Sequence, residues 1–528
     1  MGRYINPGNE GFRLLSKENY VDKTGILGIL NDCINTSSNL ICISRPRRFG
    51  KSYAVKTICA YYDCSVDSHE VFDGFDISKT PQYEDNINKY NVIGLDMTEI
   101  VSRYNIEDSS TGDLIKDLCL YLKNDIGTLY PTIDITRHIT DVLYDLVKLT
   151  QRKIVFVIDE WDAVIREFPN DDKLQQKYLE LLRSFFKSST FTPDCIAAAY
   201  MTGILPIKKN KSQSAISDFK EYTVISPGKF AGYIGFNESE VRILCDKADM
   251  DFDRMKWWYD GYTLGSKAEI YNPYSVMSAI ENHEFGSYWQ QTSAAESLKT
   301  YINMNFKGLQ EDILRLLSGE ELEINPRSFK NDFMSFETKN EVLTLLTHLG
   351  YLTYDKETQT VHIPNEEIRF EFKDLLENTD HTRLANLVNS SQKLLADTLS
   401  CNEENVLSAI ENIRQSEYAP TFYNDEQALR YVIKFAYIVC VDKYMKVEKL
   451  PSGKGIADVV FIPKKRTSDP AIIVELKWNK TADAAIAQIK SRNYPKVLEE
   501  YSGEMILVGI NYDDKTKEHC CKIEKIQL

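Results

Sequence analysis

Four short apolar runs recur in the first part of the chain, separated by longer segments of mixed polarity. They are "NLICIS" (39–44), "YNVIGLDM" (90–97), "KIVFVIDE" (153–160) and "CIAAAYMTG" (195–203). Continuous apolar runs of this length are typical of strands buried on both faces of a parallel sheet. The segments between them are long enough for crossover helices. The pattern therefore predicts an α/β domain over residues 1–230.

The pattern changes after residue 230. Residues 231–285 are rich in aromatic and turn residues. The pattern of the following residues, 286–375, is mostly typical of helices. A later piece, "GYLTYDKETQTVHIP" (350–364), has the character of a β-hairpin. We predict a helical lid and a winged-helix-like region within residues 231–379.

The last part of the chain, residues 380–528, has a third pattern. Helical segments precede a hairpin pattern, "GIADVVFIPKKRTSDPAIIVELKW" (455–478). An alanine-rich helix (481–494) and one more strand, "EMILVGINY" (504–512), follow. This order indicates a separate α/β unit with a restriction-endonuclease-like arrangement of strands.

Composition narrows the class of protein. The 528 residues carry a net charge of −15, which argues against coating nucleic acid by bulk electrostatics but allows a local basic groove. The 11 cysteines are scattered, without a Cys-x-x-Cys pair, so neither a disulfide framework nor a zinc cluster is expected. The N-terminal segment has no apolar signal region, and no run is long enough to span a membrane. We expect a cytoplasmic protein without membrane contact.

The first candidate site lies in "LICISRPRRFGKSYAVKTI" (40–58). An apolar strand leads into a loop ending Gly50-Lys51-Ser52, and a helix follows, which is the context of a phosphate-binding loop. The N-terminus of the helix offers free N–H groups and a positive dipole end to phosphate. Lys51 would reach the outer phosphates, and the hydroxyl of Ser52 would bind Mg²⁺. The alternative is a chance Gly-Lys-Ser in an ordinary strand–helix turn.

Arg45 stands where the usual loop has its first glycine. Pro46 fixes its own φ and favours extended geometry at Arg45, so the loop would start rigidly. The main phosphate donors come later, so the substitution leaves the site possible. We therefore include the rest of the loop and the helix start among the candidate nucleotide-binding residues: Arg47, Arg48, Phe49, Gly50, Lys51, Ser52 and Tyr53.

Acids follow the third apolar run directly. Asp159 and Glu160 end "KIVFVIDE", and acids at the C-terminal end of a buried parallel strand lie where α/β folds bind ligands. Asp159 would bind Mg²⁺, and Glu160 would polarise the attacking water. Asp162 is interpreted as supporting or solvated. Thr202 ends the fourth run and would lie near the γ-phosphate, with a simple strand-end threonine as the alternative.

The second candidate site lies on the C-terminal hairpin. If Lys464 and Asp469 flank the turn as partners, antiparallel pairing places Asp458 opposite Glu475, with both carboxylates on one face. Lys477 points to the same face, because it is two residues further along the strand. Two metal-binding acids and a lysine are the groups needed for Mg²⁺-assisted phosphodiester hydrolysis. The alternative is a pair of solvent-exposed strands with opposite charges. However, the residues beside Glu475 and Lys477 are apolar, and burying charged groups that have no function among them would be unfavourable.

Several motifs together resemble a known family. "YVDKTG" (20–25), "SRPRRFGKS" (44–52), "FVIDEWD" (156–162), "TGILPIKK" (202–209) and "WWYDGY" (257–262) are similar to the bacterial AAA-ATPase-like family, whose members often carry a C-terminal PD-(D/E)XK nuclease-superfamily domain. In that family Arg-Pro-Arg-Arg-Phe-Gly-Lys-Ser is the usual Walker A form. The resemblance implies that Asp159 and Glu160 form Walker B and that Thr202 lies near a sensor position. Asp22 and Lys23 match a family motif without an assigned role.

The resemblance also extends the second site. It implies that Glu426, on a helix before the hairpin, and Gln488, on the helix after it, belong to the catalytic set, and Tyr494 matches a common position. Ala457 stands where the superfamily's name has proline. The alternative for Glu426 and Gln488 is an exposed side chain on a helix, and the alternative for Tyr494 is a packing role.

These observations predict an ATP-binding and ATP-hydrolysing protein coupled to a Mg²⁺-dependent nuclease, with DNA as the favoured substrate and RNA left open. One alternative is a regulatory NTPase whose C-terminal domain binds nucleic acid or protein without cleavage. Another is a nucleotide-binding scaffold with little or no hydrolysis. Homo-oligomerisation remains open, and Arg166 and the loop arginines are candidates for an arginine that completes a neighbour's site.

Overall fold

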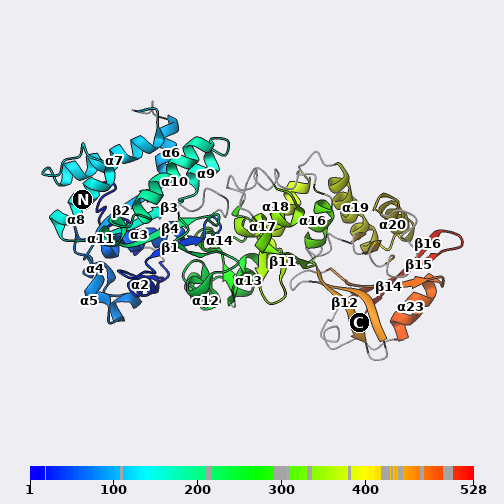
Figure 1. Ribbon diagram of the computed structural model, residues 1–528. Helices are drawn as coiled ribbons and strands as arrows, with labels where there is room; N and C mark the ends of the chain where they lie inside the picture. Colours follow the sequence, from blue (N-terminus) through cyan, green and yellow to red (C-terminus); the bar gives the residue numbers. More distant parts are fainter. Residues whose placement is uncertain are drawn as a thin grey trace. The chain divides into compact units, whose positions relative to one another are not determined.

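The computed structural model divides the chain into two compact units (Figure 1). One comprises Met1–Ala294 with Glu323–Glu367, and the other comprises Ala295–Leu322 with Ile368–Leu528. The expected domain boundaries at residues 230 and 379 stay predictions. The structure describes residues 1–17, 20–106, 111–207, 216–265, 267–289, 306, 308–317, 319–329, 336–377, 382–417, 429, 432–433, 436–437, 444–452, 455–463, 469–491 and 504–527.

The N-terminal unit is built on a five-stranded sheet in the order β2-β3-β4-β1-β5. All of its neighbouring strands are parallel. The strands are β1 (Leu40–Ser44), β2 (Asn91–Asp96), β3 (Ile154–Asp159), β4 (Ile196–Gly203) and β5 (Lys220–Tyr222). The four apolar runs are therefore strands of one parallel sheet, as predicted. Their C-terminal ends lie at one edge, which is where both candidate acids and the loop after β1 emerge.

Helices cover both faces of this sheet. Alternate residues of β3 point to opposite sides: Ile154, Phe156 and Ile158 join a large core, whereas Val155 and Val157 face the other side. The large core is completed by helices α6 (Met97–Ile106), α7 (Leu114–Leu129), α8 (Ile139–Thr150) and α10 (Asp172–Phe186). Helix α3 (Lys51–Tyr62) packs against β2 and β3. Burial on both faces explains why the strands are apolar throughout.

A smaller layer follows the sheet in the same unit. It contains the antiparallel strands β6 (Phe236–Asn237), β8 (Lys267–Tyr271) and β7 (Tyr262–Leu264), in that order. Helices α12 (Glu238–Ala248), α13 (Phe252–Tyr259) and α14 (Pro273–Asn282) share one hydrophobic core with these strands. Asn237 and Glu240 form a capping box at the start of α12, and Pro273 occupies the first turn of α14.

Helix α17 (Lys339–Leu349) and the hairpin of β10 (Thr353–Asp355) and β11 (Thr360–His362) come next. The helix begins with a capping box formed by Thr338 and Glu341, and it ends at Gly350, whose φ is 89°. The sheet order is β10-β11-β9, with β9 at Leu322–Glu323. Helix α17 is therefore followed by the β10–β11 hairpin, and the earlier strand β9 pairs with β11. This is the winged-helix-like arrangement that the sequence predicts.

The C-terminal unit contains a mixed five-stranded sheet in the order β12-β13-β14-β15-β16. Strands β14 and β15 are parallel, and the other pairs are antiparallel. Helix α23 (Ala482–Ser491) connects the parallel pair and packs on it. The strands are β12 (Tyr444–Ser452), β13 (Gly455–Pro463), β14 (Ala471–Trp478), β15 (Glu504–Asp513) and β16 (Glu518–Gln527).

The remaining described elements complete the two units, and one of them, α20 (Glu403–Glu417), packs against β16. They are α1 (Glu10–Leu15), α2 (Gly25–Asn31), α4 (His69–Phe72), η1 (Asp76–Lys79), α5 (Tyr83–Asn86), α9 (Ala163–Glu167), α11 (Phe191–Cys195), η3 (Gly228–Phe230), α16 (Leu309–Leu317), η5 (Pro326–Ser328), α18 (Glu366–Glu377), α19 (Thr382–Leu399) and α20 (Glu403–Glu417). None of the helices in the described ranges is both long enough and apolar enough to cross a membrane.

Candidate functional site

The loop between β1 and α3 presents backbone donors at the C-terminal edge of the sheet. Gly50 is the N-cap of α3, with a φ of 91° in the left-handed region, where a side chain would be strained. No side chain caps this helix. The first N–H groups of an uncapped helix have no intrahelical partner, and together with the helix dipole they favour an anion. The local geometry therefore fits phosphate.

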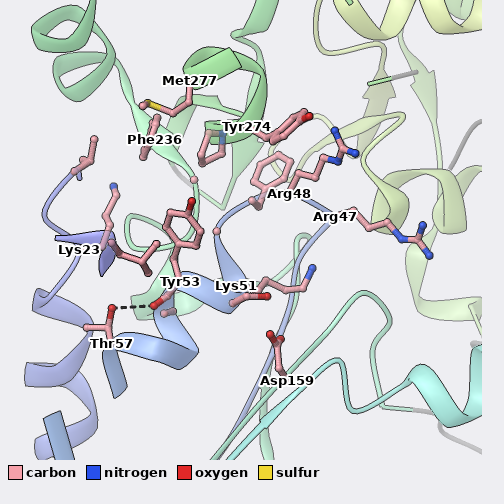
Figure 2. A pocket seen from close by; sticks show the side chains of 18 of the residues that line it. Lys23, Arg47, Arg48, Lys51, Tyr53, Thr57, Asp159, Phe236, Tyr274 and Met277 are labelled. Atoms are coloured by element: carbon pink, nitrogen blue, oxygen red, sulfur yellow. Dashed lines mark hydrogen bonds between the residues drawn. The ribbon is translucent and has the colours of Figure 1, made fainter. Parts of the chain in front are cut away.

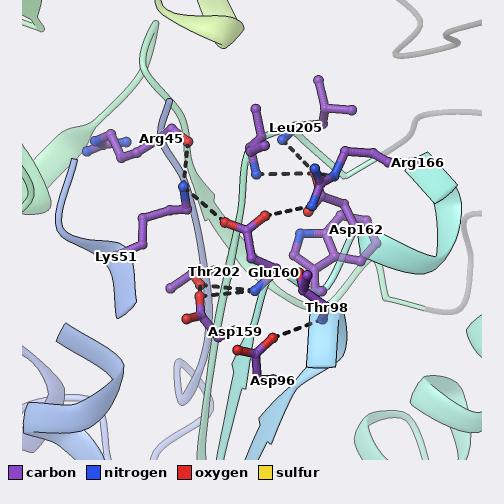
Figure 3. Close-up of polar contacts among 12 residues, drawn as sticks. Arg45, Lys51, Asp96, Thr98, Asp159, Glu160, Asp162, Arg166, Thr202 and Leu205 are labelled. Carbon is purple, nitrogen blue, oxygen red and sulfur yellow. Dashed lines mark hydrogen bonds and ion pairs between the residues drawn. The ribbon is translucent and has the colours of Figure 1, made fainter. Parts of the chain in front are cut away.

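Lys51 is held at this loop by three oxygen atoms. Its Nζ donates to the carbonyl oxygens of Arg45 (3.2 Å) and Pro46 (3.0 Å) and lies 3.2 Å from Oε1 of Glu160. The side chain is only 4% exposed. Ser52, the next residue, is exposed. The ammonium group therefore connects the start of the loop with the acid that follows β3 (Figure 3).

The three arginines of the loop have three different environments. Arg45 is fully buried, and its Nη1 donates to the carbonyl oxygens of Ser44 (2.9 Å) and Tyr222 (3.1 Å). Burial lowers the pKa of Arg45 to about 10. This arginine stabilises the start of the loop and does not line the cavity described below.

Arg47 and Arg48 do line that cavity. Burial and the nearby charge of Arg166 lower the pKa of Arg47, and the charges of Glu160, Glu167 and Asp162 oppose this shift. The guanidinium of Arg48 lies 3.9 Å from the ring centre of Tyr274, and its Nη1 donates to the carbonyl oxygen of Tyr288. Arg48 therefore joins the loop to helix α14 (Figure 2).

Two apolar residues of the loop are packed against the smaller layer and the α17 region. The ring of Phe49 meets that of Tyr262 edge to face, with centroids 5.0 Å apart. A Cβ placed on Gly350 would lie 2.8 Å from Cβ of Pro46, so these two residues are in close contact. This packing fixes the rigid loop start that the sequence predicts from Pro46.

Asp159 and Thr202 lie side by side at the sheet edge. The hydroxyl of Thr202 donates to Oδ1 of Asp159, and the same Oδ1 accepts the N–H of Glu160 at 3.0 Å. Asp159 is 3% exposed. Glu160 has a φ of 48°, which is unusual for a residue with a side chain and turns the chain sharply after β3. The structure thus brings together the two acids and the threonine that the sequence singles out.

The charge on Glu160 is set by two cations. Burial alone would raise the pKa of its carboxyl, but the charges of Lys51 and Arg166 lower it below the ordinary value. Asp162, by contrast, is buried, and burial raises its pKa. Oδ2 of Asp162 accepts the N–H groups of Ile204 and Leu205, so this acid supports the turn and is not solvated.

Asp96 is a further acid at this edge that the sequence analysis did not single out. It ends β2 and is paired in register with Asp159 on the neighbouring strand. Partial burial and the charge of Asp159 raise the pKa of Asp96, and the residue lines the same cavity. The rule that pointed to Asp159, an acid at the C-terminal end of a buried parallel strand, would have identified Asp96 in "YNVIGLDM".

A cavity of about 1110 Å³ extends from this edge into the space between the N-terminal segment and α14 (Figure 2). One end is lined by Gly50, Lys51, Ser52, Asp159 and Glu160. The other end, at Phe236, Tyr274 and Met277, is more apolar (Figure 2). Further apolar and aromatic side chains line the cavity, namely Tyr20, Val21, Ile26, Tyr53 and Tyr233. A polar, cationic end joined to an aromatic end suits a ligand with phosphates and a flat ring system.

The motif residues Asp22 and Lys23 now have structural partners. Asp22 accepts the N–H and hydroxyl of Thr24 and the N–H of Asp76, which fixes the start of α2. Nζ of Lys23 lies 2.7 Å from the carboxylate of Glu240 on α12, and Lys23 lines the cavity. The motif therefore connects the N-terminal segment to the smaller layer beside the cavity.

The second candidate site lies on β13 and β14 of the C-terminal unit. Val459 pairs with Val474, Val460 with Ile473 and Phe461 with Ile472, which is the register expected from the sequence. One residue further along, this register sets Asp458 opposite Glu475. The side chain of Asp458, together with Glu426 and Tyr494, lies outside what the structure describes.

Three of the predicted residues converge here. Glu475 is 1% and Lys477 is 7% exposed. Nζ of Lys477 lies 2.8 Å from Oε1 of Glu475, and Nε2 of Gln488 on α23 donates to the same oxygen. The hydrogen bond between Gln488 and Glu475 supports the placement that the family resemblance implied. Among the described residues, no group of three or more acidic, histidine or cysteine side chains gathers in a metal-binding arrangement.

Gly509 allows α23 to lie close enough for this contact. It is the register partner of Glu475 on β15. A Cβ on Gly509 would lie 2.5 Å from the carbonyl oxygen of Ala482 and 3.0 Å from Cβ of Ala485. Small residues on both surfaces therefore bring the helix onto the strand and Gln488 over Glu475.

Comparison with known proteins gives matches to two families. Residues 8–212 match a family described as predicted AAA-ATPase, and residues 436–522 match the PD-(D/E)XK nuclease superfamily. An uncharacterized protein in the vnfD 5′ region of Azotobacter chroococcum mcd 1 is 21% identical over 275 residues, which are 52% of this chain and 50% of that protein. The chain thus spans about half the length of this curated relative.

Two solved structures are also similar, at low scores. The ORC2 protein of Aeropyrum pernix, in ADPNP and ADP complexes, gives a TM-score of 0.31 at 11% identity, covering 68% of this chain and 96% of that chain. Cdc6p of Pyrobaculum aerophilum gives 0.26 at 10% identity, covering 67% and 92%. Scores this low carry no inference. The family matches and the two sheets agree with the architecture that the sequence predicts, an AAA-ATPase-like domain followed by a PD-(D/E)XK nuclease-superfamily domain.

Proposed function

We propose that the N-terminal domain binds and hydrolyses ATP with Mg²⁺. The observation that carries this proposal is the cavity in which the uncapped start of α3, the ammonium of Lys51 and the acids after β3 face one space. Its apolar end gives a flat base a place among aromatic side chains. The family match over residues 8–212 supports the same activity.

Different residues at the polar end of the cavity would bind the phosphates and the Mg²⁺ ion. The N–H groups at the start of α3 and Nζ of Lys51 would bind the phosphates. The hydroxyl of Ser52 and the carboxylate of Asp159 would hold Mg²⁺, because hard cations prefer oxygen ligands. When bound, the metal neutralises charge on the phosphates. The hydrogen bond from Thr202 fixes the rotamer of Asp159.

Glu160 would orient the attacking water and accept its proton. The ion pairs with Lys51 and Arg166 keep the carboxylate charged, so that it can serve as an acceptor. A phosphate bound at Lys51 would share that ammonium with Glu160. Nucleotide binding is thereby linked directly to the position of the catalytic acid.

Nucleotide occupancy would also reach the smaller layer of the same unit. Arg48 contacts Tyr274 on α14, and Phe49 contacts Tyr262 on β7. Movement of the loop on binding phosphate would change both contacts. We propose that this is how the ATPase domain controls the middle region and, through it, the C-terminal domain.

For the C-terminal domain we propose Mg²⁺-dependent cleavage of nucleic acid, with DNA favoured over RNA. Asp458 and Glu475 would hold the metal, Lys477 would orient the water, and Glu426 and Gln488 would complete the site. The contact of Lys477 and Gln488 with one oxygen of Glu475 supports this proposal. Buried charges at this position are costly unless they serve a function or are well paired.

ATP turnover by the full-length protein tests the first proposal, with Lys51→Ala and Glu160→Gln as variants. Both are expected to lose turnover, and Glu160→Gln is expected to keep ATP binding. Mg²⁺-dependent cleavage of mixed DNA and RNA substrates tests the second, with Asp458→Ala and Glu475→Ala as variants. Binding without cleavage, unchanged in Glu475→Ala, would favour the non-cleaving alternative. Sedimentation with and without ATP would decide whether the protein is a homo-oligomer.

A further inference from the structure

Arg166 spans two acids of its own chain. It lies on α9, directly after the turn that contains Asp159 and Glu160, and its side chain is 12% exposed. Nη2 lies 2.7 Å from Oε2 of Glu160, and Nε lies 3.4 Å from Oδ2 of Asp162 (Figure 3). The guanidinium therefore donates a hydrogen bond to Glu160 and forms an ion pair with Asp162, so it connects the two carboxylates.

Asp162 is in turn fixed to the segment that follows β4. It is 1% exposed, and Oδ2 accepts the N–H groups of Ile204 at 3.2 Å and Leu205 at 3.0 Å. A Cβ on Gly203 would lie 2.9 Å from Oδ1 of Asp162, so the acid has little room to move. Arg166 is thus anchored, through Asp162, to the end of the strand that carries Thr202.

Glu160 has a backbone that needs such support. Its φ of 48° lies in a region that residues with side chains seldom adopt, and such positions persist only where surrounding contacts hold them. Each oxygen of its carboxylate has its own cation: Oε1 faces Lys51 and Oε2 faces Arg166. Phosphate would compete for Lys51, whereas Arg166 lies on the opposite side of the carboxylate from that ammonium.

We propose that Arg166 is a positioning residue that holds Glu160 within its own chain while Glu160 acts on the attacking water. Asp162 fixes the guanidinium against the end of β4. This inference rests on the proposed ATPase function. It separates Arg166 from the candidates for an arginine donated to a neighbouring copy. If Arg166 left its own chain, buried Asp162 would lose its cation and Glu160 would lose one of its two cations.

The first test compares ATP hydrolysis by the full-length protein and its variants. Arg166→Ala is expected to lower kcat on the order of 10- to 100-fold, the loss typical of a misplaced catalytic group. The Kd for ATP should stay within about 3-fold, because phosphate contacts remain. Arg166→Lys should restore part of kcat. Arg137→Ala is the matched control, since Arg137 pairs with Asp145 in an exposed position of the same unit.

Asp162→Asn keeps the size of the side chain but removes the charge that fixes the guanidinium. It should lower kcat in the same way, and it provides the readout if Arg166→Ala does not fold. The double variant should lose little more than Arg166→Ala alone, because both changes remove one arrangement. If the loss of kcat in the double variant equals the product of the losses in the two single variants, the assigned link between Arg166 and Asp162 is overturned.

Mixing variants tests whether the arginine acts within its own chain. Arg166→Ala retains an intact phosphate loop, and Lys51→Ala retains an intact arginine. If Arg166 served a neighbour, the mixture would regain turnover above the sum of its parts, which would overturn the inference. No regain is expected. If the wild type hydrolyses ATP and Arg166→Ala has the same kcat, this inference alone is refuted. If the wild type does not hydrolyse ATP, the proposed ATPase function is refuted as well.

Discussion

Substituting Gly509 by alanine should separate the two candidate activities of the chain. The added Cβ would lie 2.5 Å from the carbonyl oxygen of Ala482, 3.0 Å from Cβ of Ala485 and 3.1 Å from Cγ1 of Ile486. Two of these atoms belong to backbone or a Cβ and cannot rotate away. Helix α23 must therefore move outward, and Gln488 moves with it, away from Glu475.

The cost can be bounded from the packing. Inserting a methyl group into a well-packed contact costs roughly 1–3 kcal/mol of the free energy of unfolding. The C-terminal unit has about 190 residues, and domains of this size lose about 2–4 °C of Tm per kcal/mol. Gly509→Ala should therefore lower the melting temperature of this unit by about 2–12 °C.

Scanning calorimetry of the full-length protein with and without ATP measures this change. The transition that ATP raises belongs to the nucleotide-binding unit. The other transition should fall in Gly509→Ala, nuclease activity should fall with it, and ATP turnover should remain. Gly74→Ala is the matched control, because a Cβ at Gly74 meets nothing within 4 Å. Equal melting of Gly509→Ala and Gly74→Ala would refute the close packing of α23 on β15.

Three other substitutions test separate parts of the structure. Thr202→Val removes the hydroxyl that donates to Asp159 and should lower kcat for ATP hydrolysis, while Thr202→Ser should retain it; equal rates in both would contradict a role for this hydrogen bond. Tyr274→Ala removes the ring beneath Arg48, a contact of about 0.5–1 kcal/mol, and should raise the Kd for nucleotide by about 2- to 5-fold, with Tyr274→Phe near wild type in equilibrium binding. Burial raises the pKa of Asp260 from 3.8 to about 6, so the folded protein binds more protons than the unfolded chain between these values, and its stability should fall as pH rises through them. Asp260→Asn should remove up to about 3 kcal/mol of this loss in urea unfolding above pH 6, and the same pH dependence in Asp260→Asn and the wild type would contradict the assignment.

Local patterns in the sequence determined the strands, the loop and the hairpin. Four apolar runs became four parallel strands, because burial on both faces requires continuous apolar sequence whatever the order of the strands. Gly50, Lys51 and Ser52 could be placed at the start of a helix, because the strand–loop–helix context is contiguous. The register of β13 and β14 also followed from the sequence, because the turn residues set which positions face each other.

The tertiary structure decided which distant side chains meet. The sheet sets β1 beside β4 and β2 beside β3, so Asp96, Asp159 and Thr202 reach one edge from segments far apart in the chain. The aromatic lining of the cavity comes from the N-terminal segment, α3, residues 233–236 and α14, which no local pattern connects. The three loop arginines look equivalent in sequence, yet packing buried Arg45, left Arg47 lining the cavity and set Arg48 on Tyr274. Periodicity reports which face of an element is buried, but the partner of a charged side chain depends on how the elements pack together.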